Sequence, residues 1–78
     1  MTEPISTGMF LGQNIGSKVA VKLIDDTLLS GSLVTFDENL NVVLANVEEV
    51  LRQGKINTHE DLFVRGNSIR FLYPVQEE

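Results

Sequence analysis

Three runs of alternating apolar and polar residues, joined by two polar turns, constrain the fold of this chain more than any other feature. They fill the stretch from Val19 to Glu49. In the first run, the residues at 19, 21 and 23 alternate with those at 18, 20 and 22, a period of two that predicts a half-buried strand. The turns contain Asp25–Thr27 and Asp37–Asn41, and Asp and Asn favour turns because their side chains bond to nearby backbone. The stretch therefore predicts three consecutive strands.

The second predicted strand, Leu28–Phe36, has a glycine at its middle. One face of this strand would carry Leu29, Gly31, Leu33 and Thr35, and the other Leu28, Ser30, Ser32, Val34 and Phe36. A glycine within a strand removes a side chain where a sharply bent sheet would otherwise collide with itself. Strong bending is how a small sheet closes into a barrel, so Gly31 predicts a barrel rather than a flat sheet.

The third predicted strand, Val42–Val50, is followed by a polar segment with two interpretations. Gln53-Gly54 is typical of a hairpin turn. On that interpretation the third strand extends to Arg52, and a fourth begins one or two residues after the glycine. On the alternative interpretation, residues 57–61 form an exposed loop.

The remaining apolar segments are short. Residues Gly8–Asn14 predict a helical turn that packs on the sheet, since two glycines lower its helix propensity. Leu62–Val64 predicts the buried centre of a strand, and Ile69–Tyr73 predicts a last strand that Pro74 ends. The expected fold is all-β, with one short N-terminal helix and five strands in a small bent sheet or barrel.

A chain of 78 residues makes one small domain, and its size leaves it short of buried surface. Domains of this size bury only about 60–65% of the surface that the unfolded chain exposes. The chain has no cysteine for a disulfide and only one histidine, His59, so a structural metal is not expected either. Oligomerisation is the remaining common source of stability.

The charge and the chain ends limit the function classes. A net charge of −5 weighs against a broad basic face for duplex nucleic acid, but it is compatible with a small site for a single strand. No apolar run reaches the roughly 18 residues of a membrane span, and the N-terminus does not resemble a secretory signal, so we expect an intracellular protein, cytoplasmic or nuclear. We divide the chain into a flexible N-terminus (1–7), a single domain (8–74) and an acidic tail (75–78).

Two motifs give the chain a resemblance to a known family. The motifs are Val19-x-Val21-x-Leu23 with Gly31-x-Leu33-x-x-Phe36-Asp37-x-x-x-Asn41-x-x-Leu44 and Glu48-Glu49, and then Phe63-Val64-Arg65-Gly66-Asn67-x-Ile69. In this order they resemble the two motifs of an Sm/Lsm (Sm-like) protein. The match covers residues 15 to 73, and the predicted helix stands in the right place before it.

The resemblance implies a strongly bent five-stranded antiparallel Sm-fold (SH3-like) barrel that assembles into rings. In such rings the fourth strand of one subunit pairs with the fifth strand of the next. The interface would then contain Leu62, Phe63, Val64, Ile69, Phe71 and Tyr73. The family default is six or seven subunits, here in a homo-oligomeric ring, and five or eight are also compatible. No cofactor, metal, small-molecule substrate or membrane partner is implied.

The resemblance also implies a site for single-stranded, uridine-rich RNA near the ring pore. Asn41 would hydrogen-bond the edge of one base, and Asp37 would hold the Asn41 amide in place. Arg65 would lie over the base, Gly66 would let the backbone approach closely, and Asn67 stands where the family often has Asp. Asn39 is a departure, because the family usually has His or an aromatic residue there to stack on the base, which is worth roughly 1–3 kcal/mol.

Simpler interpretations compete with this one. Asp37 and Asn41 are also ordinary turn formers, and Arg65-Gly66 is compatible with a turn whose arginine pairs with a neighbouring subunit's acid; the occurrence of both motifs together favours the RNA site. A ring that has lost RNA binding and serves as a protein scaffold is the main alternative, and a monomeric SH3-like peptide-binding module is the third. No catalytic set or phosphate-binding loop is present in the sequence, so we do not expect an enzyme.

Overall fold

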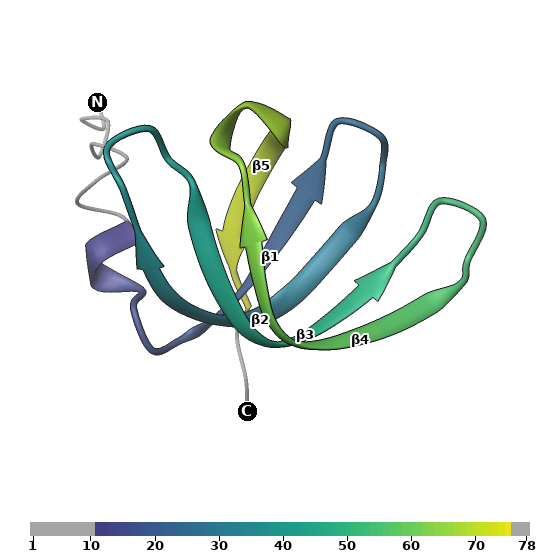
Figure 1. Cartoon of the computed structure of the whole chain (residues 1–78), viewed down its shortest axis with the longest axis horizontal. Coiled ribbons are helices and arrows are strands. Elements are labelled where there is room, and N and C mark those ends of the chain that lie inside the picture. Colours follow the sequence, from purple (N-terminus) through teal and green to yellow (C-terminus); the bar gives the residue numbers. More distant parts are fainter. Residues whose placement is uncertain (1–10, 76–78) are drawn as a thin grey trace, which may run out of the picture.

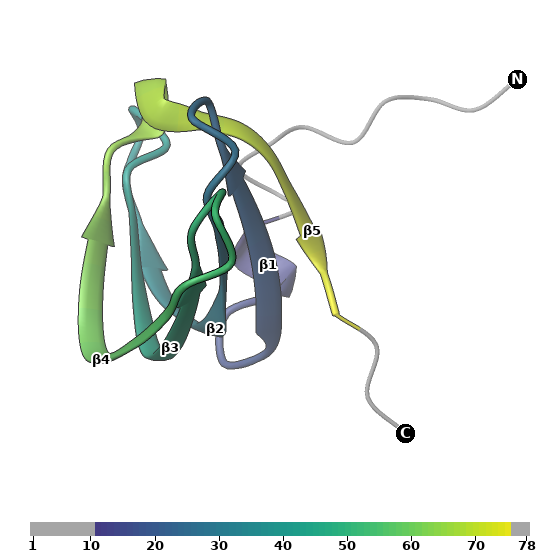
Figure 2. The same ribbon diagram turned by 90° about the vertical axis from the view of Figure 1, so that its right-hand side faces the viewer.

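The computed structural model describes residues 11–75, which form a five-stranded antiparallel sheet in the order β4-β3-β2-β1-β5. The strands are β1 (Lys18–Leu23), β2 (Leu28–Phe36), β3 (Val42–Val50), β4 (Ile56–Val64) and β5 (Ile69–Pro74), with a 3-10 turn, η1 (Gly66–Ser68), before the last. Figures 1 and 2 show the long middle strands curving so strongly that the sheet becomes an open barrel. The predicted all-β barrel with five strands is confirmed.

The short helix lies against one end of the sheet. Residues 11–13 are helical, and the Asn14 N–H donates to the Leu11 carbonyl at 3.0 Å. The Leu11 side chain is 2% exposed and belongs to the core. The described part of the predicted helical turn is therefore helical, whereas residues 8–10, the predicted flexible N-terminus and the last three residues of the predicted tail lie outside the described residues.

The core lies on the inner face of the barrel. Its buried members are Leu11, Val19, Val21, Leu29, Leu33, Val42, Leu44, Val47 and Val64. Full burial of one such side chain stabilises a fold by about 1.5–3 kcal/mol. The alternating strand patterns of the sequence place these residues on one face, which agrees with the prediction for β1 and for the first half of β2.

Gly31 has the role in bending that its position predicts. A Cβ atom at Gly31 would lie 2.8 Å from the Ala45 carbonyl oxygen and 3.1 Å from a methyl group of Val47. The register shifts at the same point, because Ser30 pairs with Glu48 whereas Ser32 pairs with Ala45. This β-bulge inserts an extra residue into β3, which increases local twist and lets the two strands bend together.

A second bulge changes the predicted faces of β2. Leu33 pairs with Leu44, but Thr35 pairs with Val43, so Val34 is the extra residue. As a result Thr35 is exposed, although strict alternation predicted it on the same face as Leu33, and Phe36 packs partly against the core. The prediction was wrong at this end of the strand because one inserted residue reverses every later side chain.

The polar segment after β3 forms a hairpin. The Leu51 N–H donates to the Lys55 carbonyl at 2.8 Å, and Gly54 has a φ of +97°, which favours glycine. β4 then runs for nine residues from Ile56, so the alternative of a loop over 57–61 is wrong. Residues 56–61 of this strand are exposed or half-buried, which agrees with the polar character of their sequence.

The sheet ends in two unpaired edges. β4 pairs only with β3, and β5 pairs only with β1, so each has one side without a partner strand. Open edges of this kind are sites for pairing with another chain. Among the described residues, no helix is long and apolar enough to cross a membrane.

Candidate functional site

The turn between β2 and β3 is held by a single carboxylate. Asp37 Oδ1 accepts hydrogen bonds from the backbone N–H groups of Asn39 (2.9 Å) and Asn41 (3.0 Å). The other oxygen, Oδ2, accepts from Nδ2 of the Asn41 side chain at 2.9 Å. Leu40, between the two bonded amides, has a φ of +66°. Asp37 therefore shapes the turn and also holds the Asn41 side chain.

The turn after β4 meets this first turn through Asn41. The Gly66 N–H donates to Oδ1 of Asn41 at 2.7 Å. A Cβ atom at Gly66 would overlap the Asn39 carbonyl oxygen and would lie 2.9 Å from the carbonyl group of Leu40. Only glycine lets the two backbones come this close, as the sequence analysis expected.

These contacts determine which way the Asn41 amide faces. Its oxygen faces an N–H donor from Gly66, and its nitrogen faces the acceptor oxygen of Asp37. Rotating the amide by half a turn would place oxygen against oxygen and nitrogen against nitrogen. One N–H of the amide and one lone pair of its oxygen are not used by these bonds, and they can recognise a ligand.

The same contacts stabilise the charged form of Asp37. The hydrogen bond from the Asn41 side chain is the main cause that lowers the pKa of Asp37 below its ordinary value of 3.8, and the two backbone N–H groups add to it. The turn therefore keeps a carboxylate, and with it an oriented amide, down to acidic pH.

The side chains of three other predicted site residues make no hydrogen bond to Asp37, Asn41 or Gly66. Arg65, Asn39 and Asn67 are exposed. Within residues 11–75, their side chains make no hydrogen bond or ion pair, so their polar groups face solvent. The structure thus brings Asp37, Asn41 and Gly66 into direct contact and leaves the other three as free groups around them.

Sequence reasoning predicted the turn between β1 and β2 but missed its contacts with the segment after β4. The Ile24 N–H donates to the Ser68 carbonyl at 3.0 Å, and Asp26 pairs with Arg70 at 3.2 Å, so the β1–β2 turn is bonded to both η1 and β5. In Figure 1 the three turns stand along the upper side of the molecule, with the β4–β5 turn between the other two, and Figure 2 shows all three at the top. No sequence motif indicates these contacts, because they join residues that are more than 40 positions apart.

The side chain of Asp25 stabilises the turn between β1 and β2 by a hydrogen bond inside that turn. Its Oδ1 accepts the Thr27 N–H at 3.0 Å, and this bond lowers the pKa of the Asp25 carboxyl. Thr27 is 3% exposed, so its side chain packs into the molecule, whereas Ile24 before the turn is 62% exposed. Among the described residues, no group of three or more His, Cys, Asp or Glu side chains could hold a metal ion.

Comparison with known proteins agrees with this geometry. The LSM domain family model matches residues 9–74. The U6 snRNA-associated Sm-like protein LSm6 of Botryotinia fuckeliana is 40% identical over 63 residues, which cover 81% of this chain and 74% of that protein. The chain belongs to the LSM domain family. Its two turn motifs are therefore those of an Sm-like protein.

Solved structures of Sm proteins share the fold. The P. aerophilum SmAP1 heptamer is 32% identical, has a TM-score of 0.85, and is covered in full by 96% of this chain. A heptameric archaeal Sm protein is 34% identical, with a TM-score of 0.78, over 86% of this chain and 97% of that one. The Sm fold, predicted from the two motifs, is confirmed.

The predicted interface residues of this LSM domain lie on its two edge strands. Phe63 on β4 and Phe71 and Tyr73 on β5 are exposed at 61%, 55% and 47%. Leu62 and Ile69 pack partly against the core, whereas Val64 is buried in it. At Val64, therefore, only the backbone is available to another chain, and the aromatic residues supply the apolar surface.

Proposed function

We propose that this LSM-domain protein forms a ring and binds single-stranded, uridine-rich RNA at its joined turns, one base per subunit. It would act inside the cell as a binding platform in RNA processing or metabolism, without chemistry on the RNA. Two facts about related proteins support the proposal: the LSm6 relative is named as U6 snRNA-associated, and two Sm relatives are heptamers.

The oriented amide of Asn41 carries the proposal. Uracil presents an acceptor, O4, next to a donor, the N3–H, along its Watson–Crick edge. The unused N–H and lone pair of the Asn41 amide match these two groups. Cytosine presents the opposite order of donor and acceptor, and the contacts of Asp37 and Gly66 oppose the rotation that would accommodate it.

The exposed groups around the amide complete the proposed site. The Arg65 guanidinium plane would cover the base and place positive charge near the phosphates. Asn39 and Asn67 would supply hydrogen-bonding groups to the sugar or to neighbouring bases. Because Asn39 offers no ring for stacking, we expect each subunit to bind its base more weakly than a site with an aromatic residue would.

Ring closure would use the two open edges. Leu62–Arg65 of one subunit would pair with Ile69–Tyr73 of the next, which covers the β5 edge and the end of the β4 edge and buries the three exposed aromatic side chains. The contact is heterologous, so it closes into a ring when a whole number of subunit rotations adds up to one full turn. We propose a homomeric ring of seven subunits, in line with the two heptameric relatives.

A binding experiment on the full chain tests the RNA proposal. Fluorescence anisotropy with labelled oligo-uridine should detect binding at low salt, and Asn41→Ala should weaken it at least about tenfold, since it removes a base contact. Asn57→Ala is the matched control, because Asn57 lies on β4, where its side-chain amide donates a hydrogen bond to Glu49 at 3.4 Å. Equal affinity for oligo-uridine and oligo-cytidine would count against the role of the oriented amide, and absence of binding would refute the proposal.

The main alternative is a ring that serves as a protein scaffold. The exposed Asn39, in place of a stacking residue, and the net charge of −5 favour it. Native mass spectrometry of the purified protein separates the two functions, because it reports subunit number and bound RNA together. A ring that never retains RNA and recovers only proteins from cell extract would favour the scaffold.

A further inference from the structure

The two edge strands differ in length, and this leaves part of one edge open in the proposed ring. β4 has nine residues and β5 has six. The pairing proposed above uses the end of β4 from Leu62 onward. The segment Ile56–Glu60, here named the free edge of β4, would then have no partner strand. This inference rests on that part of the proposed function.

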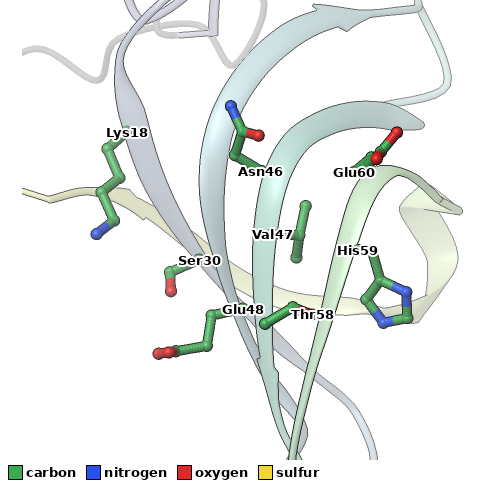
Figure 3. A pocket seen from close by; sticks show the side chains of 8 residues that line it. All are labelled: Lys18, Ser30, Asn46, Val47, Glu48, Thr58, His59 and Glu60. Carbon is green, nitrogen blue, oxygen red and sulfur yellow. The ribbon is translucent and has the colours of Figure 1, made fainter.

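A pocket of about 540 Å³ opens beside the free edge on the outer face of the sheet. It is lined by Lys18, Ser30, Asn46, Val47, Glu48, Thr58, His59 and Glu60. Ser30, Glu48 and Thr58 occupy one cross-strand row over β2, β3 and β4. Figure 3 shows their side chains on the same side of the β4 ribbon, while His59 lies on the other side. His59 instead contacts Glu49 at 2.9 Å.

The charged groups of this pocket favour a cation. Its lining includes two exposed carboxylates, from Glu48 and Glu60, and one ammonium group, from Lys18. The carboxylates approach the pocket from neighbouring strands, and the hydroxyl of Thr58 and the amide of Asn46 add acceptors near them. RNA phosphates would be repelled here, whereas an arginine or lysine side chain would be attracted.

An apolar contact lies at the other end of the free edge. Ile56 is 57% exposed and pairs with Val50, which pairs in turn with Leu28. Val50 and Leu28 are half-buried, so these three side chains form an apolar row across β4, β3 and β2. A bound chain that covered Ile56 would bury apolar surface continuous with this row.

We infer that the free edge of β4 binds an extended, basic protein segment, which adds a strand to the sheet. Along a strand, every second side chain faces the same side, so a segment aligned with β4 presents side chains in steps of two residues. An apolar residue beside Ile56 and a basic residue beside Glu60 would be separated by three residues. The partner motif is therefore an apolar residue followed, or preceded, four positions away by arginine or lysine.

Binding of a synthetic peptide to the full chain tests this inference. The probe is a fluorescein-labelled peptide Gly-Ser-Val-Thr-Ser-Thr-Arg-Thr-Ser-Gly, measured by anisotropy with the assembled protein. Glu60→Lys and Glu48→Lys should each weaken binding about tenfold, because charge reversal replaces attraction by repulsion. Glu38→Lys makes the same charge change in the β2–β3 turn, outside this pocket, and should leave peptide affinity unchanged.

Two further results would overturn the inference. One is equal binding of a peptide with glutamate in place of arginine, and the other is salt-dependent self-association of the protein in place of peptide binding. Hydrogen exchange separates this inference from the ring itself. In the assembled ring, the outward amides of Ile56–Glu60 should exchange fast and become protected only with peptide. Protection of this segment by ring assembly alone would overturn the inference while supporting a ring, whereas peptide-dependent protection in a monomer would support the inference and refute the ring.

Discussion

The two ends of this barrel are built from similar turns but differ in how their side chains are held. At the turn end, Asp37, Asn41 and Gly66 are joined by hydrogen bonds of 2.7–3.0 Å, and the bond between Asn41 and Gly66 connects two turns that lie 25 residues apart in sequence. At the hairpin end, the Leu51–Lys55 turn is closed by its own backbone, and Gly54 has open space around it. The comparison shows that a polar turn becomes a selective site when a second segment determines how its side chains are oriented.

Substitution of a glycine should therefore have the most different effects on stability and on RNA binding at the two ends. Gly66→Ala should lower the unfolding free energy by roughly 3 kcal/mol and abolish oligo-uridine binding, because the new methyl group collides with the opposite turn. Gly54→Ala should cost only about 1 kcal/mol, from its positive φ, and leave RNA binding intact. Chemical denaturation and anisotropy measure both effects. Similar losses in the two variants would remove the proposed distinction between the ends.

Restoring a stacking ring should strengthen the turn end. Asn39→Tyr places an aromatic side chain beside the Asn41 amide, and one stacked base is worth about 1–3 kcal/mol, so affinity for oligo-uridine should rise at least about fivefold. Gln53→Tyr adds the same side chain to the hairpin end and should leave RNA affinity unchanged. An Asn39→Tyr protein that binds no better than the wild type would show that the base does not lie against this turn.

The smallest effect is a dependence of stability on acidity. The folded-state pKa of Asp37 lies below its ordinary value of 3.8, so the stability it contributes is present above that pH and is lost as pH falls through the folded pKa. Asp37→Asn should flatten the acid limb of the unfolding free energy against pH, and Asp25 should leave a residual slope for the same reason. Glu60→Gln in the middle of β4 is the control, and an unchanged acid limb in Asp37→Asn would contradict the assigned bonds.

Much of the fold could be predicted from local patterns. Alternation placed β1 and the first half of β2 correctly, and Gly31 predicted the bend, because both depend on side-chain spacing within one strand. The predicted faces of β2 were wrong after Leu33, since the bulge depends on register with β3. The polar start of β4 was ambiguous because its partners, Val47 to Val50, are brought to it only by the hairpin.

The candidate site was predicted in its members but not in its connections. The two motifs named Asp37, Asn41 and Gly66, which the structure brings together, and also Arg65, Asn39 and Asn67, which it leaves exposed. The bond between Ile24 and Ser68, which adds the third turn, had no counterpart in the sequence. Neither did the pocket beside the free edge of β4, because it forms between rows of side chains that only strand pairing aligns.

The sequence by itself determined the family, the number of strands and the residues of the two turns, because periodicity and turn chemistry act over a few neighbouring positions. Only the tertiary structure decided the direction in which the Asn41 amide faces and the difference in length between the two edges. Both depend on contacts between distant segments, where a shift of one residue or a half-turn of one amide changes which groups meet. Local sequence therefore specifies the turns, whereas the closure of the barrel determines the site that they form together.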